Sequence, residues 1–175
     1  MFGQAIGAGG SGGGNISVTG PFTTAGGELS LDITGISGAK RITLLTWNLV
    51  HTGGGSVNDM NIIRIGGGGS VQTTGYNNVG AWMGVAGNGQ FFNDTAYFRI
   101  ANQGSGDLRG SAILTLLDET NNVWACNAAF GIQFTIIFQT GGICTLTSAL
   151  TNVKLTTIGG TQTFNANGKW GYIIE

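Results

Sequence analysis

Apolar and polar residues alternate with a period of two along most of the chain after residue 15, which is the spacing of β-strands. The segment Glu28–Ile33 shows the pattern in its simplest form, with leucine and isoleucine on one side and Glu, Ser and Asp on the other. No window shows a convincing helical period. The predicted strands are Glu28–Ile33, Arg41–Val50, Met60–Ile65, Ala96–Ala101, Ser111–Leu117, Val123–Ala129, Ile132–Gln139, Ile143–Leu146, Leu150–Thr157 and a last strand within Thr163–Ile174.

Clusters of Gly, Asn and Asp separate these segments, and the chain contains 34 glycines. Gly supplies positive φ angles and Asn and Asp tolerate them, so we predict turns there, the QTGG segment before Ile143 included. About nine or ten short strands with frequent turns predict an all-β fold, a jelly-roll-like antiparallel β-sandwich. We expect one such domain over residues 16–175, preceded by a short glycine-rich N-terminal arm at residues 1–15.

Several predicted strands are apolar on both faces. In the tract Phe130–Phe138 we expect Ile132, Phe134, Ile136 and Phe138 on one side and Ile137 on the other. One face can fill the space between two sheets, whereas the other must be covered by a loop or another subunit, since an exposed apolar strand invites aggregation. The pattern therefore favours a homo-oligomer.

Charge is scarce, with seven basic and eight acidic side chains, or 9% of the chain. Ordinary domains carry about 25% charged residues, and a monomer so poor in charge is expected to be poorly soluble. This composition favours a protein that works inside a large assembly. No basic stripe is present, so we expect no nucleic-acid partner. No signal-peptide pattern and no run of about 18 apolar residues occurs, so we expect no membrane insertion.

The two cysteines, Cys126 and Cys144, each lie in an apolar stretch. We expect two buried thiols that act as small hydrophobic side chains, although the sequence leaves open a disulfide between them.

Catalytic motifs occur only without the context that they need. The glycine tail matches G-x-G-x-x-G and G-x-S-x-G, yet neither match has a strand before it or a helix after it. The aspartates in the predicted loops lack the spacing of an EF-hand calcium site, and the preference of Asp for turns accounts for their positions. The only adjacent acids, Asp118 and Glu119, are typical of a hairpin turn. We predict no catalytic residues, no cofactor and no metal site, and hence no enzyme.

The long segment Gly75–Gly84 contains the residues that could meet a partner. It is not clearly a strand, and its Tyr76 and Trp82 could stack on sugars while Asn77 and Asn78 bond hydroxyl groups. The alternative is a loop folded back with both rings in the core. The only histidine, His51, follows a strong strand; no serine or carboxylate is marked as its partner, and a surface or loop histidine is the simpler interpretation. The candidate contact residues are His51, Tyr76, Asn77, Asn78 and Trp82.

The C-terminal run GGICTLTSALTNVKLTTIGGTQTFNANGKWGYIIE has the order of strand, turn, strand, Gly-Gly turn and closing aromatic strand. With the stretches Ile36–Leu45 and Ile63–Tyr76, the segment Leu146–Ile174 resembles the C-terminal β-sandwich domains of tailed-bacteriophage virion proteins, chiefly tail fibres. The resemblance implies a jelly-roll-like sandwich at a virion surface, in a homotrimer.

The resemblance predicts a phage virion structural protein of the tail-fibre or receptor-binding type, assembled in the host cytoplasm. The arm would attach it to other virion proteins, and its loops would meet a host surface glycan. A fibre normally carries a long shaft before such a tip, whereas this chain has a short arm. This leaves open a capsid head-decoration protein, and a free lectin-like carbohydrate-binding module is a third hypothesis.

Overall fold

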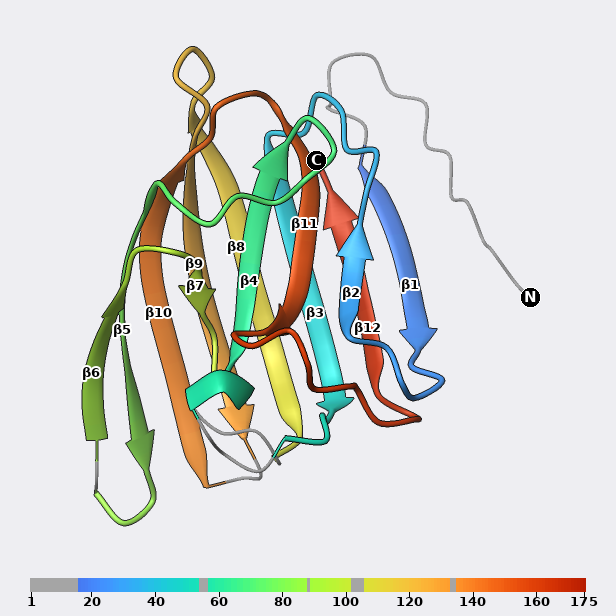
Figure 1. Ribbon diagram of the computed structural model, residues 1–175, viewed down its shortest axis with the longest axis vertical. Helices are drawn as coiled ribbons and strands as arrows, with labels where there is room; N and C mark the ends of the chain where they lie inside the picture. Colours follow the sequence, from blue (N-terminus) through green and yellow to red (C-terminus); the bar gives the residue numbers. More distant parts are fainter. Residues whose placement is uncertain (1–15, 54–56, 88, 102–105, 133–134) are drawn as a thin grey trace.

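Two antiparallel β-sheets pack face to face in the computed structural model, which describes residues 16–53, 57–87, 89–101, 106–132 and 135–175 (Figure 1). A single 3-10 turn, η1 (Val57–Asp59), interrupts the strands in this part of the chain. The strands are β1 (Ser17–Thr23), β2 (Ser30–Ile33), β3 (Arg41–Leu49), β4 (Asn61–Gly67), β5 (Tyr76–Gly84), β6 (Gly89–Asp94), β7 (Phe98–Arg99), β8 (Leu108–Asp118), β9 (Val123–Ile132), β10 (Ile136–Thr145), β11 (Leu150–Thr157) and β12 (Lys169–Ile174).

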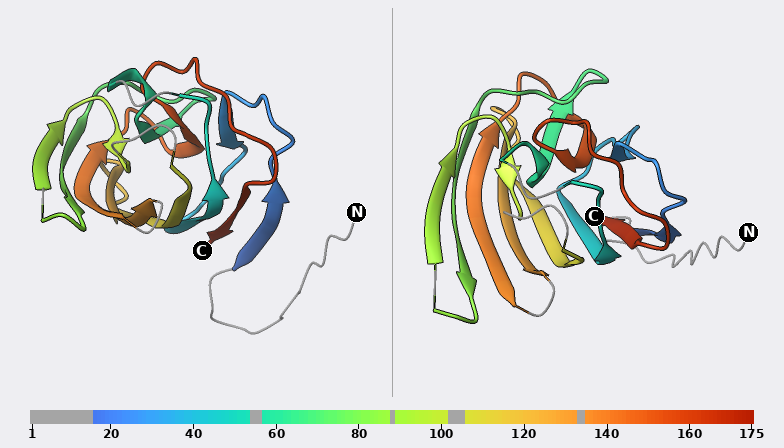
Figure 2. Two further views of the ribbon diagram at one scale, coloured as in Figure 1. Left: turned by 90° about the horizontal axis from the view of Figure 1, so that it is seen from below. Right: turned by 60° about the horizontal axis from the view of Figure 1, so that its bottom comes forward.

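The larger sheet has eight strands in the order β1-β12-β3-β8-β9-β10-β5-β6, and the smaller has four in the order β2-β11-β4-β7. The chain passes from one sheet to the other at most connections from β1 to β8 and again around β11, so strands distant in sequence become neighbours. This confirms the predicted jelly-roll-like sandwich. The four-stranded sheet lies in front of the middle of the eight-stranded sheet, whose end strands β6 and β1 lie on opposite sides of the molecule (Figures 1 and 2).

The core fills the space between the sheets with alternate residues of their strands. Ile42 and Leu44 of β3 and Leu114 of β8 point inward from the larger sheet, and Ile63 and Leu155 point inward from the smaller one, all of them buried. The alternation of apolar and polar residues in the sequence therefore identifies the residues of this inner face correctly.

Two predicted strand boundaries are wrong near the apolar tract. The segment Ile132–Gln139 is not one strand, because β9 ends at Ile132 and β10 begins at Ile136. Thr135 donates its backbone N–H to the Ile132 carbonyl at 3.0 Å, which closes the connection. The prediction for Phe134 lies outside the described residues. Ile137 is exposed on the face opposite the buried Phe138, as expected.

The Gly-Gly pair of QTGG lies inside β10 rather than in a turn, so Ile143–Leu146 does not form a separate strand. A Cβ atom on Gly142 would lie 2.5 Å from the carbonyl oxygen of Asn77 in the neighbouring β5. Glycine is needed there because two backbones approach closely, and the sequence alone does not distinguish this use of glycine from a turn.

The segment Gly75–Gly84 is also a strand, since Tyr76–Gly84 forms β5 between β10 and β6. The prediction of a loop was wrong because the two glycines at Gly80 and Gly84 interrupt its apolar alternation. The strands Ser17–Thr23 and Gly89–Asp94 were not predicted. The predicted arm at residues 1–15 lies outside the described residues.

Candidate functional site

The most distinctive surface is the outer face of the eight-stranded sheet, the face turned away from the four-stranded sheet. Cross-strand partners define it through one continuous row, Gly171, Leu45, Ser111, Ala129, Gln139, Ala81 and Phe91. Among the described residues, nine of the thirteen exposed large hydrophobic side chains lie on this face by strand alternation: Val18, Leu45, Trp47, Val79, Met83, Phe91, Leu117, Ile137 and Ile143. A face of this kind marks an interaction surface.

Charge is almost absent from the outer face. Over β9, β10, β5 and β6 its described side chains are only Gly, Ala, aliphatic, Phe, Met, Thr, Asn and Gln residues. The charged side chains on the remaining strands are Arg41, Arg109, Asp118 and Lys169. Arg109 is ion-paired with Asp107, and the other three lie at strand ends. Charged side chains, which proteins commonly place on exposed sheets to prevent association, are therefore missing over half of this surface.

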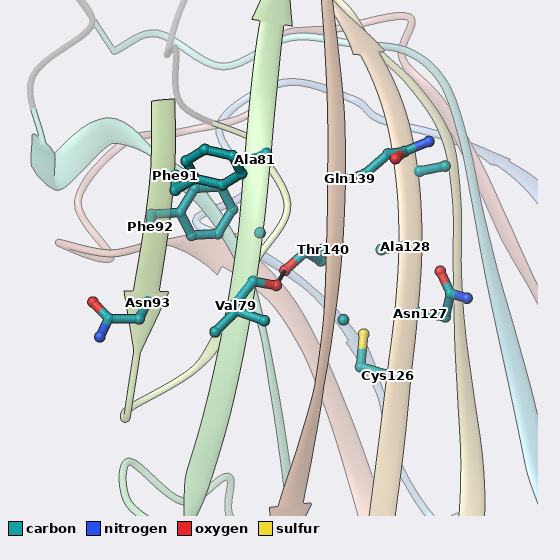
Figure 3. Close-up of a pocket in the computed structure, with 13 residues that line it drawn as sticks. Val79, Ala81, Phe91, Phe92, Asn93, Cys126, Asn127, Ala128, Gln139 and Thr140 are labelled. Carbon is teal, nitrogen blue, oxygen red and sulfur yellow. Dashed lines mark hydrogen bonds between the residues drawn. The ribbon is translucent and has the colours of Figure 1, made fainter. Parts of the chain in front are cut away.

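A hollow of about 910 Å³ lies on the outer face over β9, β10, β5 and β6 (Figure 3). Its lining includes no residue of the four-stranded sheet, which places it outside the sandwich. Three small residues from neighbouring strands, Ala81, Ala129 and Gly141, leave room for it. We call this part of the face, the outer side chains of β9, β10, β5 and β6, the hollow end.

Polar and aromatic side chains surround the hollow without any charge among its lining residues. Asn93 of β6, Asn127 of β9 and Gln139 of β10 are exposed amides, and no hydrogen bond of these side chains is found within the described part of the chain. Phe91 is 92% exposed, the highest value for a large hydrophobic residue in the described chain. The hollow can therefore take an uncharged group that offers apolar surface and hydrogen bonds.

The other half of the outer face is the tryptophan end, formed by the outer side chains of β1, β12, β3 and β8. Trp47 of β3 is 60% exposed, and the Arg109 guanidinium lies over its ring at 4.7 Å from the centroid. Beside it is a smaller notch of about 260 Å³, lined among others by Val18, Pro21 and Leu45. Hence both ends of the face combine an exposed aromatic ring with a recess.

Tyr76 is only 4% exposed and belongs to the core. Its hydroxyl accepts the Ile65 backbone N–H at 2.8 Å and lies 3.1 Å from the Ile65 carbonyl, so it links β5 to β4 of the other sheet. Its ring packs edge-on against Phe98 at 5.0 Å. Burial raises the pKa of this hydroxyl. The alternative of a ring in the core is thus correct for Tyr76, and a contact with an external partner is not available to it.

Asn78 is also buried, at 1% exposure, on the inner face of β5. With its amide oriented to satisfy both ends, Nδ2 donates to Thr140 Oγ1 at 2.8 Å and Oδ1 accepts the Arg99 N–H of β7 at 3.2 Å. Like Tyr76, it therefore joins the sheets. Asn77 is exposed on the outer face, whereas Trp82 is half-buried against the core. Of the candidates in this strand, Asn77 alone is fully available to a partner.

His51 lies in the connection between β3 and η1, as expected of a loop histidine, but it is only 2% exposed and therefore not on the surface. It forms an isolated bridge with Phe164, whose ring lies edge-on to it, and Nδ1 accepts the Gly53 N–H at 3.0 Å. Burial lowers its pKa, and the Asp59 charge opposes this shift. The histidine therefore packs between the C-terminal segment and η1 rather than facing a ligand.

The two cysteines are free and buried, as expected. They lie on the inner faces of the paired strands β9 and β10, where Cys126 is opposite Gly142 and Cys144 is opposite Trp124. Burial raises the pKa of Cys126 to about 12 and that of Cys144 to about 11, so both stay protonated near neutral pH.

The carboxylates are occupied by turn and ion-pair contacts. Asp118 accepts the N–H groups of Thr120 and Asn121, which confirms the predicted turn, and Asp94 pairs with Arg99 at 2.6 Å. Within the described ranges, no three His, Cys, Asp or Glu side chains gather as metal ligands would. The same ranges contain no helix that could span a membrane.

Comparisons with family models, with curated proteins and with solved structures found no match to this chain. The fold and the outer face therefore carry the functional argument. The residues around the hollow, Phe91, Asn93, Asn127 and Gln139, were not singled out from the sequence. Apolar residues on both sides of neighbouring strands were the available signal, but only the strand order shows that these four residues meet on one face.

Proposed function

We propose that the chain is a phage virion structural protein, a tail-fibre or receptor-binding type module at the particle surface, that works as a homotrimer. The observation that carries the proposal is the outer face of the eight-stranded sheet, where large hydrophobic side chains are exposed and charge is nearly absent. A chain that must stay dissolved as a monomer would expose this face at the cost of aggregation.

The size of the face suits a stable interface between copies. Eight strands about 4.8 Å apart and about eight residues long cover on the order of 1,000 Å². A specific interface needs about 800 Å² from each partner. The resemblance of the C-terminal strands to phage appendage domains supports placing the assembly on a virion.

The first test is the mass of the full chain by size-exclusion chromatography with light scattering. We expect three times the chain mass of 17.9 kDa, maintained on dilution to low micromolar concentration. A monodisperse monomer would contradict the proposal. Immunogold labelling of particles from the encoding host then locates the protein. Label on the tail supports the first proposal, label over the capsid supports a head-decoration protein, and unlabelled particles exclude both.

A lectin-like carbohydrate-binding module is the second candidate, and the amides of Asn93, Asn127 and Gln139 around the exposed Phe91 favour it. Aromatic rings and neutral amides suit sugar faces and hydroxyl groups. A glycan array with the wild-type chain tests this function. Binding of neutral glycans together with unlabelled particles would favour the lectin over the virion protein.

We further propose that residues 1–15 attach the domain to other virion proteins. Deletion of this segment is expected to leave the urea unfolding midpoint and the oligomer mass unchanged while the protein is lost from particles. Unfolding of the truncated chain would instead make the segment a part of the domain.

A further inference from the structure

We infer that Arg64 and Lys154 bind the acidic group of a host surface glycan, on the face of the four-stranded sheet that is turned away from the core. The acidic group is a carboxylate or a phosphate, since both present charged oxygens in pairs. The inference rests on the proposed receptor-binding function and goes beyond it by naming a site and a class of glycan. This face lies on the opposite side of the sandwich from the outer face, so it stays accessible when the outer face is buried between copies (Figure 1).

Strand register places three charged side chains in one row on this face. Lys154 of β11 is the cross-strand partner of both Asp32 in β2 and Arg64 in β4. Their neighbours along the strands, such as Val153 and Ile63, belong to the core, so the side chains of the row point away from it. Lys154 Nζ lies 3.2 Å from Asp32 Oδ1. The row therefore contains two cations and one carboxylate.

Arg64 differs from the other basic residues because its side chain has no partner for its charge. Of the seven Lys and Arg residues, five form ion pairs, namely Lys40, Arg41, Arg99, Arg109 and Lys154. Lys169 donates a hydrogen bond to Thr23 Oγ1. For the Arg64 guanidinium, neither an ion pair nor a hydrogen bond is found in the part of the chain that the structure describes, and its buried Nε–H has no acceptor. Its donors are therefore left for a ligand.

The Arg64 guanidinium is held in place before a ligand binds. It lies over the Tyr97 ring, 5.7 Å from the centroid. Two residues further along the same face of β4, the chain folds back over Gly66, where a Cβ atom would overlap the Ser70 carbonyl oxygen. An arginine that packs on a ring beside such a turn loses less side-chain freedom when it binds an anion, and this favours affinity.

The charges of the row favour one bound anion. Arg64 and Lys154 are direct cross-strand partners, with Cβ atoms about 5 Å apart, and like charges in this position destabilise a sheet. An acidic group between them removes this repulsion, because the guanidinium can donate to two of its oxygens and the ammonium to one. Two cations and the Asp32 carboxylate leave one positive charge, which a single carboxylate neutralises. A neutral sugar gains none of this stabilisation.

Titration of the full chain with glucuronic acid, glucose 6-phosphate and glucose, followed by NMR chemical shifts in low-salt buffer, tests the inference. We expect saturable binding of at least one of the acidic sugars and none of glucose. Binding should weaken at about 0.5 M NaCl, because salt screens exposed charges. Binding of glucuronic acid alone identifies a carboxylate as the acidic group, and binding of glucose 6-phosphate alone identifies a phosphate.

Four variants show whether the row is the site. Arg64→Gln is expected to weaken binding about tenfold or more, because charge-assisted hydrogen bonds are lost. Lys154→Gln should weaken it about threefold, and Asp32→Asn should strengthen it about threefold by removing the carboxylate that competes for Lys154. Arg41→Gln is the matched control, since it removes an exposed arginine that pairs with Glu175 on the other sheet, and it should bind like the wild type.

Urea midpoints verify that each variant is folded, and Asp32→Asn still tests the site if Arg64→Gln does not fold. The inference is overturned if neither acidic sugar binds, if glucose binds equally well, if folded Arg64→Gln binds like the wild type, or if Asp32→Asn weakens binding. Tighter binding of N-acetylglutamate than of both acidic sugars would overturn it in favour of an acidic peptide.

The oligomer mass tests the proposed function separately, because Asp32, Arg64 and Lys154 lie off the outer face. A trimer that binds no acidic sugar overturns this inference alone. A monomer that binds one through Arg64 overturns the proposed trimer and leaves the site.

Discussion

The inner and outer faces of the eight-stranded sheet come from the same strands and contain similar apolar residues, yet only the inner face is covered by the chain itself. On β3, Ile42 and Leu44 are buried under the four-stranded sheet, while Leu45 and Trp47, at the alternate positions of the same strand, are exposed. Alternation therefore shows that both faces are apolar, but it does not show which face the chain covers and which it leaves exposed.

The largest expected effect is a difference in the free energy of unfolding between a substitution on the inner face and one on the outer face. Leu114 of β8 is fully buried on the inner face, and Leu114→Ala is expected to lower the free energy of unfolding by about 3 kcal/mol through lost burial and a cavity. Leu45→Ala on the outer face should cost less than about 0.5 kcal/mol in the isolated monomer.

Urea unfolding followed by tryptophan fluorescence, at concentrations low enough to keep the chain monomeric, measures both values. At higher concentration Leu45→Ala should weaken self-association, whereas Leu114→Ala should act mainly on folding. Equal losses of monomer stability would show that the outer face is covered within one chain and would remove the distinction.

A smaller effect should come from the hydrogen bonds that hold the inner face to the other sheet. Tyr76→Phe leaves the buried Ile65 N–H without its acceptor and is expected to cost about 1–3 kcal/mol in the free energy of unfolding. Tyr172→Phe is the control, because no hydrogen bond of its hydroxyl is found among the described residues, and it should change stability by less than about 0.5 kcal/mol. Equal urea midpoints for the two variants would show that the Tyr76 hydroxyl does not stabilise the pairing of the sheets.

The sequence predicts the central strands well and the outer half of the larger sheet poorly, for physical reasons. Leu150–Thr157 matches β11 because a continuous alternation ends at a Gly-Gly turn, where Gly160 has a positive φ of 63°. Gly142 and Gly80 gave the same local signal inside strands, where they permit close contacts rather than turns.

The wrong choice of Tyr76 and Asn78 as contact residues followed from this error. A predicted loop at Gly75–Gly84 directed attention to Tyr76 and Asn78, which the strand turns inward. The hollow depends on pairing among β6, β5, β10 and β9, and such non-local pairing is not visible in any one segment. Strands with two apolar faces did, however, predict an apolar face that the described chain does not cover itself.

The smallest effect should come from pH, and it should act on the interior alone. His51 is the only histidine, and burial holds its pKa below the ordinary value of about 6.5. Below pH 6.5 the histidine therefore binds a proton in the unfolded chain but stays neutral in the folded chain. The free energy of unfolding then falls as the pH decreases toward the lowered pKa. The outer face carries Arg and Lys but no group that titrates in this range. Stability of the monomer should thus decrease between pH 7.5 and 5.5 while the dissociation constant of the oligomer stays constant. His51→Gln should remove that decrease in urea titrations. An unchanged pH dependence of stability in the variant would assign the decrease to another group. A pH-dependent dissociation constant would mean that a titrating group lies in the interface.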